Sequence, residues 1–346
     1  MLVRDFELEL PDELIAQEPV PRGESRLLVL GPGEAIEHLA VADLPSLLRP
    51  GDLLVVNDTR VLPARLFGRR RPGGGWVEML LAEEVSPTDW DALVKPGRKA
   101  TPGTVIDVSA DLSAEVMAKG DDGRHRLRFS APVLPRLEAI GHVPLPPYIK
   151  RQDRPEDRER YQTVWAAEPG AIAAPTAGLH FTEELLARLA ERGISRATVT
   201  LHVGLGTFKP VTTELVHEHR MDAERYAIPE ATLAAIRRAR EAGGRIVAVG
   251  TTTTRCLEGC AAAHCGDLVP GPGRTALFIT PGFDFRVVDV LLTNFHLPRS
   301  TLLMLVSAFG GRERVLAAYR EAVRERYRFY SYGDAMLVWR REGVRA

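Results

Sequence analysis

A buried strand that ends in polar residues and leads into a helix recurs along this chain, and this repeat limits the folds available to it. The strands are predicted at residues 52–56, 245–250, 275–280 and 287–292, where most side chains are apolar. Strands that are apolar throughout are buried on both faces, as in parallel sheets covered by helices. Their alternation with helices is the pattern of an α/β fold. We therefore predict an α/β domain with a mostly parallel sheet covered by helices.

Residues 62–142 follow a different pattern. Short segments of alternating apolar and polar residues, at 76–81, 112–118 and 124–129, are separated by glycine-rich turns. Regularly spaced short strands of this kind indicate a small β-barrel or sandwich, and we predict the barrel. A chain of 346 residues is long for a single core, so two domains are expected. We predict a discontinuous α/β domain at 1–61 and 143–346, interrupted by an inserted β-barrel domain at 62–142.

The composition is that of an ordinary globular protein, with 45% hydrophobic and 26% charged residues. No apolar run approaches the roughly 20 residues of a membrane span, and the first residues lack the basic flank and apolar core of a signal peptide. We expect a cytoplasmic protein and a monomer. The cysteines, Cys256, Cys260 and Cys265, fit neither a disulfide framework nor a paired zinc knuckle, and a metal would need a fourth ligand such as His264. We expect them to be semi-buried on a helix, and we predict no metal centre.

The net charge of −1 argues against a protein that coats nucleic acid, although an average can conceal a basic stripe. Arginine-rich runs occur at residues 69–71, 148–160 and 312–328. Most such runs are solvated faces. The last two lie close to aromatic residues, which modestly favours a contact with RNA.

Two glycine-rich stretches, at 173–182 and 200–208, each combine glycine with histidine, threonine and phenylalanine. Glycine lets the backbone bend or approach another group closely, so the pair indicates a binding site rather than plain core packing. Thr182 is a suitable N-cap for a helix that Gly193 ends, and residues 197–203 alternate as a strand with His202 on its polar side. We expect His180 and His202, at the two ends of this helix and strand unit, to face one substrate.

Polar residues at the carboxyl ends of buried strands are where open α/β sheets bind ligands. Residues 57–60 are such a group, although taken alone they are better explained as a capped turn. The threonines at 251–254 precede a helix whose free N–H groups suit a carboxylate or phosphate, and threonines are also ordinary N-caps. A cluster at 217–224 holds two histidines and three carboxylates, and its spacing favours catalytic or substrate contact over a metal site.

Several blocks along the chain together resemble the S-adenosylmethionine:tRNA ribosyltransferase-isomerase family of queuosine synthesis. The blocks that carry the resemblance are residues 17–26, 27–30, 56–65, 173–181, 202–207, 293–298 and 333–336. Their number and order are far more specific than any single glycine-rich motif. One departure is visible: the family commonly has His-x-Met-His-x-Glu, and this chain reads His219-Arg220-Met221-Asp222-Ala223-Glu224.

The resemblance implies transfer of the ribosyl part of S-adenosylmethionine to the aminomethyl group of a 7-deazaguanine in the tRNA anticodon, with release of adenine and methionine. A sulfonium acidifies the hydrogens on C5′, so a base of near-neutral pKa can start the reaction without a metal or redox cofactor. His180 and His202, with His296 as a third candidate, are the expected catalytic groups. The methionine carboxylate is expected at 251–254, and tRNA phosphates at Arg60, Arg65 and the arginine-rich segments. The residues expected to bind or position substrate are Asn57, Asp58, Thr59, Arg60, Thr176, Gly178, Gly204, Gly206, His219, Glu224, Thr251, Thr252, Thr253 and Asn294.

Two other classes of protein compete with this interpretation. One is a nucleotide-dependent oxidoreductase or a methyltransferase that uses S-adenosylmethionine. Against it, residues 203–207 supply only Gly-x-Gly, and Lys209 stands where a dinucleotide-binding loop would have its third glycine. The other is an RNA-binding barrel on an inert scaffold, for which polar strand ends bearing histidine have no purpose.

Overall fold

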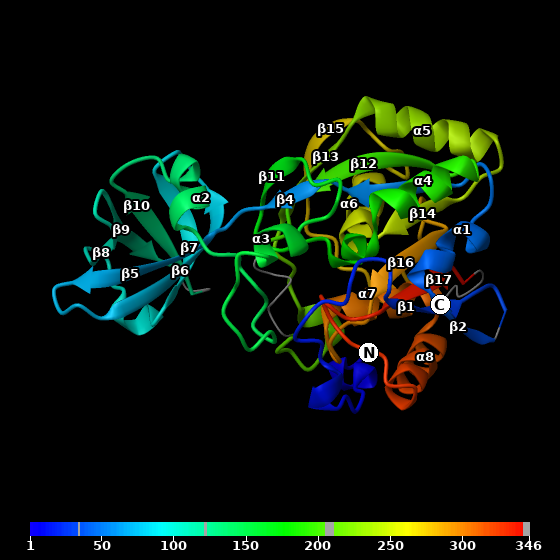
Figure 1. The fold of residues 1–346 in the computed structure, drawn as a ribbon, viewed down its shortest axis with the longest axis horizontal. Helices are drawn as coiled ribbons and strands as arrows, with labels where there is room; N and C mark the ends of the chain where they lie inside the picture. Colours follow the sequence, from blue (N-terminus) through cyan, green and yellow to red (C-terminus); the bar gives the residue numbers. More distant parts are fainter. Residues whose placement is uncertain (34, 121–122, 205–210, 342–346) are drawn as a thin grey trace.

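The computed structural model describes residues 1–33, 35–120, 123–204 and 211–341. It has two bodies: a large layered α/β part and a small β-barrel that projects from one end of it (Figure 1). The predicted fold class is therefore confirmed. Within these described ranges no helix is both long and apolar enough to cross a membrane.

A nine-stranded mixed sheet is the centre of the α/β part, in the order β15-β13-β12-β3-β14-β16-β17-β1-β2. The predicted parallel character holds at its centre, where β12, β3, β14 and β16 pair in parallel, while the pairs β15-β13, β13-β12, β16-β17 and β1-β2 are antiparallel. Along the chain the strands are β1 (Arg26–Leu30), β2 (Ile36–Ala40), β3 (Leu53–Asn57), β12 (Ser195–Leu201), β13 (Glu224–Ile228), β14 (Ile246–Val249), β15 (Gly271–Thr275), β16 (Val290–Asn294) and β17 (Ala335–Trp339).

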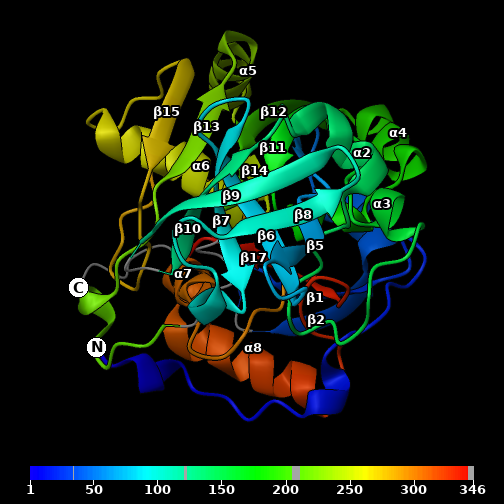
Figure 2. The same cartoon turned by 90° about the vertical axis from the view of Figure 1, so that its left-hand side faces the viewer.

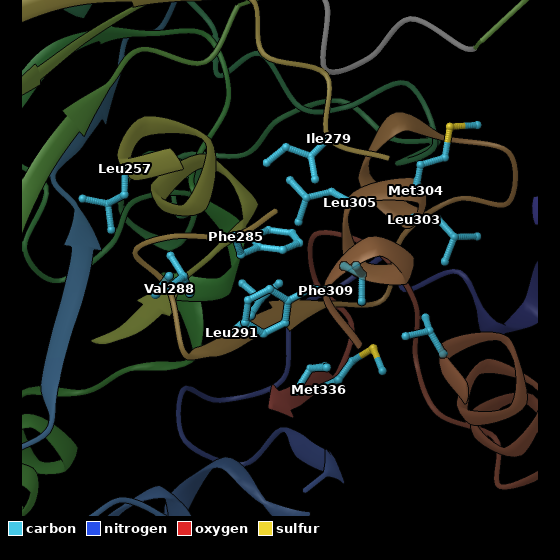
Figure 3. Close-up of a cluster of buried hydrophobic side chains, with 14 of the residues drawn as sticks. Leu257, Ile279, Phe285, Val288, Leu291, Leu303, Met304, Leu305, Phe309 and Met336 are labelled. Carbon is cyan, nitrogen blue, oxygen red and sulfur yellow. The ribbon is translucent and has the colours of Figure 1, made fainter. Parts of the chain in front are cut away.

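Helices cover both faces of this sheet because its central strands are apolar on both sides. On one face, Leu54 and Val56 of β3 pack with helices α1 (Leu44–Leu47) and α4 (Glu183–Glu191). On the other face, Leu53 and Val55 belong to a larger core that includes residues of four helices. These are α5 (Glu230–Glu241), α6 (Thr251–Ala263), α7 (Thr301–Gly310) and α8 (Arg312–Arg324). Figure 3 shows part of this core, with Phe309 of α7 beside Phe285 and Leu291.

The barrel closes in the order β10-β7-β6-β5-β8-β9, and all of its neighbouring strands are antiparallel (Figure 2). Its core is formed by side chains from within the barrel segment together with Ile172. The domain boundaries at 62 and 142 stay a prediction. The barrel strands are β5 (Arg65–Arg71), β6 (Trp76–Glu84), β7 (Asp89–Lys95), β8 (Val105–Ser109), β9 (Leu112–Lys119) and β10 (Arg124–Phe129).

Short elements connect the two bodies. Strand β4 (Thr59–Val61) leaves the end of β3 and pairs in parallel with β11 (Glu168–Ala171). The helices α2 (Leu137–Ile140) and α3 (Asp157–Arg160) lie on the return path from the barrel. Two ion pairs also join the bodies: Arg124 of β10 contacts Asp222 at 2.7 Å, and Arg274 of β15 contacts Glu83 at 3.3 Å.

Two of the predicted elements differ in the structure. The apolar segment 275–280 is not a strand, because only its first residue belongs to β15 and Ile279 instead packs onto the core beside α7 (Figure 3). Helix α6 begins at Thr251 rather than at Arg255, so the four threonines form its first turn.

Candidate active site

One cavity of the α/β part opens at the carboxyl ends of β14 and β16, and we call it the main cavity because it collects the largest group of site candidates. It collects five of the residues expected at the site, together with a group of aromatic and small residues. The expected residues are Thr176, Thr251, Thr252, Asn294 and His296. They come from three segments that are far apart in the sequence, so the sheet edge assembles them as strand topology predicts.

The start of helix α6 forms one wall of this cavity. Gly250 stands between β14 and α6 with φ of +93°, a backbone angle that favours glycine. The first N–H groups of an α-helix have no partner within the helix, and they carry its positive dipole end. Since Gly250, Thr251 and Thr252 line the cavity, this wall offers an anion several donors. Thr253 is fully buried and donates to the carbonyl of Val249 at 2.8 Å, so it stabilises the turn instead.

Asn57 holds two elements of the site together and is itself almost fully buried. Its amide nitrogen donates to the carbonyl of Leu201 at 2.9 Å and to the hydroxyl of Thr252 at 3.2 Å. Its amide oxygen accepts from the backbone N–H groups of Leu201 and Thr59. Both ends of the amide are therefore occupied by protein, and Asn57 positions the start of α6 without facing the cavity.

His296 lies at the end of β16 and borders the main cavity. Its Nε2 is 2.8 Å from the hydroxyl of Thr293, and its backbone N–H donates to the hydroxyl of Tyr319 at 2.9 Å. Burial lowers the pKa of the imidazole to about 3. The ring is therefore neutral at physiological pH and has one nitrogen able to accept a proton.

His180 lies directly behind Asn294 rather than on the main cavity. It ends a short 3₁₀ helix, η6 (Thr176–His180), and its Nδ1 is 2.9 Å from the hydroxyl of Ser25. Its Nε2 and the amide oxygen of Asn294 are both buried without a hydrogen-bond partner. Burial lowers the pKa of His180 to about 4, while Asn294 acts in the opposite direction. A change in the Asn294 side chain would therefore alter the pKa of His180.

His202 belongs to another cavity, between the barrel and the sheet edge. Its Nδ1 is 2.8 Å from the hydroxyl of Thr59, and the ring lies against Gly170, where a Cβ atom would come within 2.8 Å of it. Its pKa is lowered by burial and then by the charge of Arg225. The three candidate histidines thus border three different cavities within the described residues.

The remaining candidates near His202 form a polar network. Glu224 is buried, accepts from the N–H of Gly204 at 3.0 Å, and forms a buried ion pair with Arg255 of α6. Asp58 accepts from the hydroxyl of Thr200 at 2.6 Å. Gly204 and Glu224 line the same cavity as His202.

Four further candidates lie elsewhere. Arg60 is exposed on β4. The ring of His219 stacks edge-on against Phe278 at 5.3 Å between ring centroids. Gly178 allows close packing, because a Cβ atom there would approach Thr163 within 2.6 Å. Gly206 lies outside the described residues.

Tyrosines and a serine complete the main cavity, and sequence reasoning missed them as site residues. The hydroxyl groups of Tyr148 and Ser331 are 2.6 Å apart. Tyr161 and Tyr330 are buried, and the hydroxyl of Tyr161 has no hydrogen-bond partner among the described residues. The sequence signal for these tyrosines is their position next to arginine-rich runs, a pattern that favours contact with RNA rather than a lining for this cavity.

The family described as queuosine biosynthesis protein matches residues 3–338. The chain belongs to this family. The S-adenosylmethionine:tRNA ribosyltransferase-isomerase of Gloeobacter violaceus is 58% identical over 97% of this chain and 96% of its own length. The enzyme of the same name from Aquifex aeolicus is 51% identical over 98% of this chain and 100% of its own length.

A crystal structure of S-adenosylmethionine tRNA ribosyltransferase from Thermotoga maritima is similar to the structure of this chain. The two share 44% sequence identity over 96% of this chain and 99% of the other, with a TM-score of 0.55. Together these relatives confirm the family inferred from the sequence blocks. As a member of the queuosine biosynthesis protein family, the chain is an enzyme of the transferase and isomerase class.

Proposed function

We propose that this enzyme transfers and isomerises the ribosyl moiety of S-adenosylmethionine onto 7-aminomethyl-7-deazaguanine at the wobble position of a tRNA. The products are epoxyqueuosine-tRNA, adenine and methionine. The observation that carries the proposal is the main cavity, where one helix start, one neutral histidine and a set of buried aromatic residues meet. The family and the names of the relatives support it.

The main cavity suits the parts of S-adenosylmethionine. Rings that line the cavity, such as Tyr148 and Tyr330, offer an apolar surface to an adenine base. The N–H groups and hydroxyls at Thr251 and Thr252 suit the methionine carboxylate, because a helix start favours a negative group. The sulfonium and ribose would then lie between these two walls, near Asn294 and His296.

The protein's own residues supply proton transfers in this scheme. A neutral imidazole such as His296 accepts a proton from C5′, which the adjacent sulfonium acidifies, and its pKa of about 3 makes it a weaker base than the near-neutral group expected from the sequence. The aminomethyl nitrogen of the tRNA base forms a new C–N bond to a ribosyl carbon and loses a proton. The carbon–sulfur bond, the glycosidic bond and the ring C–O bond of the ribose break, and one new C–C bond and one new C–O bond close the cyclopentane and the epoxide. Methionine leaves with the sulfur electron pair, adenine takes up one of the two protons released, and the other passes to solvent. His180 acts on the same centre through Asn294. We assign His202 to the barrel-side wall of the same site, since Val203 lines both its cavity and the main cavity.

Release of free adenine tests the proposal. Adenine should be released from S-adenosylmethionine only when a tRNA carrying 7-aminomethyl-7-deazaguanine is present, and not with the same tRNA carrying guanine. Methyl transfer without adenine release would overturn the proposal in favour of a methyltransferase. Substitution of His180, His202 or His296 by alanine should each lower turnover by about 100-fold or more if that ring moves a proton. Near-normal turnover in a folded variant would remove that histidine from the chemical step.

Three expectations from the sequence belong with this proposal. We propose that S-adenosylmethionine is a co-substrate and that the reaction needs no metal or redox cofactor, since every step above is a proton transfer or a displacement at carbon. A cytoplasmic location is consistent with a tRNA substrate. The monomeric state stays a prediction.

A further inference from the structure

Two arginines line a small cavity beside His180, and a third arginine stands close by. Arg22 and Arg160 border this cavity together with Ser25, His180 and Ser331. Arg328 lies near enough that its charge, like that of Arg22, lowers the pKa of His180. We call this small cavity, with its three arginines, the arginine cavity.

These arginines are bonded to backbone carbonyls and not to carboxylates. Arg22 donates through Nη2 to the carbonyls of Glu159 at 3.0 Å and Gln162 at 2.6 Å. Arg160 donates to the carbonyl of Val20, and Arg328 to that of Glu18. Across the part of the chain that the structure describes, none of the three arginines forms a salt bridge, and Nη1 of Arg22 and of Arg328 is buried without a partner.

Two other arginines of residues 148–160, the run that includes Arg160, are paired with carboxylates. Arg151 forms a short pair with Asp157 at 2.6 Å, and Arg158 contacts Glu138 at 3.0 Å. The segment therefore provides carboxylates where a guanidinium needs one. Among the described residues, the three arginines of the arginine cavity have no such carboxylate, and two of them have a buried N–H donor without a partner. Protein groups alone therefore do not satisfy this arrangement.

The electrostatics agree with this geometry. Burial lowers the pKa of Arg22, and the charge of Arg160 lowers it further, while the charge of Glu159 partly offsets this. Burial also lowers the pKa of Arg328, although Asp334 partly offsets this. An anion with two free oxygens would stabilise the charged form of both buried guanidinium groups, because one planar guanidinium group can bind two such oxygens at once.

We propose that the arginine cavity binds a phosphodiester of the substrate RNA, next to the nucleotide that reacts. This inference rests on the proposed function. Ser331 lines both the arginine cavity and the main cavity, and His180 and Asn294 separate the two. A nucleotide whose base reaches the main cavity would therefore carry its phosphate here. The methionine carboxylate has the start of α6 within the main cavity, so it does not need these arginines.

The loop that carries Arg22 is built to hold a fixed position. Pro19 and Pro21 restrict its backbone, and Gly23 donates its N–H to the carbonyl of His180 at 3.0 Å. Ser25 bonds the ring of the same histidine. A phosphate held by Arg22 would thus be tied to η6, whose first residue, Thr176, lines the main cavity.

Binding of RNA and of S-adenosylmethionine by single variants of the whole enzyme tests this inference. The probe is an anticodon stem-loop RNA, measured by fluorescence anisotropy over a series of salt concentrations. R22A, R160A and R328A should each weaken RNA binding about tenfold and reduce the salt slope by about one. Their affinity for S-adenosylmethionine, measured by calorimetry, should be unchanged. R237A is the matched control, because Arg237 is exposed on α5, away from both cavities.

The outcomes separate the alternatives. Weaker binding of S-adenosylmethionine with unchanged RNA binding would assign the arginine cavity to a carboxylate and overturn the inference. Unchanged binding of both ligands would show a purely structural role and would also overturn it. If R22A does not fold, R22Q and R328A carry the same test. Failure of the wild-type enzyme to bind the RNA or to release adenine would instead contradict the proposed function itself.

Discussion

At the scale of single residues, burial decides the chemistry of this enzyme's histidines. His180 is buried within hydrogen-bond distance of Ser25, and its pKa is lowered to about 4 from an ordinary value of 6.5. When the pKa of a group is lower in the folded state than in the unfolded state, protonation of that group destabilises the folded state. We predict that the free energy of unfolding falls as the pH is lowered from about 6.5 towards 4, by up to roughly 3 kcal/mol from His180.

The matched variant for this prediction is His180→Asn, which has no titrating ring. Urea unfolding at several values of pH should show a smaller loss of stability for the variant than for the wild type over this window. Carboxylates such as Asp52, whose pKa is lowered by its hydrogen bonds to Arg245 and Arg49, lose their contribution only at lower pH. Parallel curves for the two proteins above pH 4 would show that His180 does not titrate as described.

Gly170 supports His202 through close approach. A Cβ atom at Gly170 would lie 2.8 Å from ring atoms of His202, so alanine there must displace the imidazole from Thr59. We predict that Gly170→Ala lowers turnover by about 100-fold if His202 transfers a proton, measured as adenine release. Gly282→Ala is the control, since Gly282 also has positive φ but has open space around it. Equal turnover in both variants would show that His202 takes no part in the chemical step.

At the scale of elements, the sequence predicted the central strands and the helices because their patterns are local. Residues 52–56 and 245–250 are apolar runs, and Thr182 does cap α4 by accepting from the N–H of Leu185 at 3.0 Å. The strand β13 was missed because its charged residues resembled the polar cluster before it. Glu224 of this strand is buried, and its carboxylate pairs with Arg255 of α6. Such pairing between distant elements leaves no local pattern in a sequence.

The pair of Glu224 and Arg255 fixes the edge strand β13 to helix α6. Both side chains are only 4% exposed, so removing one of them leaves a buried charge without its partner. We predict that Arg255→Leu lowers the free energy of unfolding by about 3 kcal/mol or more, measured by urea denaturation. Arg324→Leu removes an arginine whose side chain is 71% exposed from its pair with Glu321, and should cost less than about 1 kcal/mol. Similar costs for both variants would contradict the structural role of the buried pair.

At the scale of the whole molecule, the sequence identified five of the residues that line the main cavity, but not how the candidates are grouped. Asn57 and Asn294 were both predicted at strand ends, yet Asn57 faces inward to hold α6 while Asn294 borders the main cavity. His180 and His202 were expected to face one substrate, and they border separate cavities. The direction of each side chain depends on packing across the sheet and against the barrel. Spacing along the chain contains no record of that packing.

The barrel and the α/β part have separate cores, and this arrangement predicts how the whole enzyme unfolds. All residues that line the main cavity lie outside the barrel segment, so a ligand bound there stabilises only the α/β part directly. We predict two calorimetric transitions, only one of which shifts with S-adenosylmethionine. At 100 times the dissociation constant, the shift should correspond to about 2.7 kcal/mol.

Two core variants assign these transitions. Leu127 is fully buried in the barrel and Leu257 is fully buried in α6, and replacing either by alanine should cost about 2–5 kcal/mol in its own unit. Leu127→Ala should therefore lower the transition that does not respond to S-adenosylmethionine, and Leu257→Ala the one that does. A single transition that moves as a whole with the ligand and with both variants would show one cooperative unit. In that case the contacts of Arg124 with Asp222 and of Arg274 with Glu83 would join the two cores more strongly than their exposure predicts.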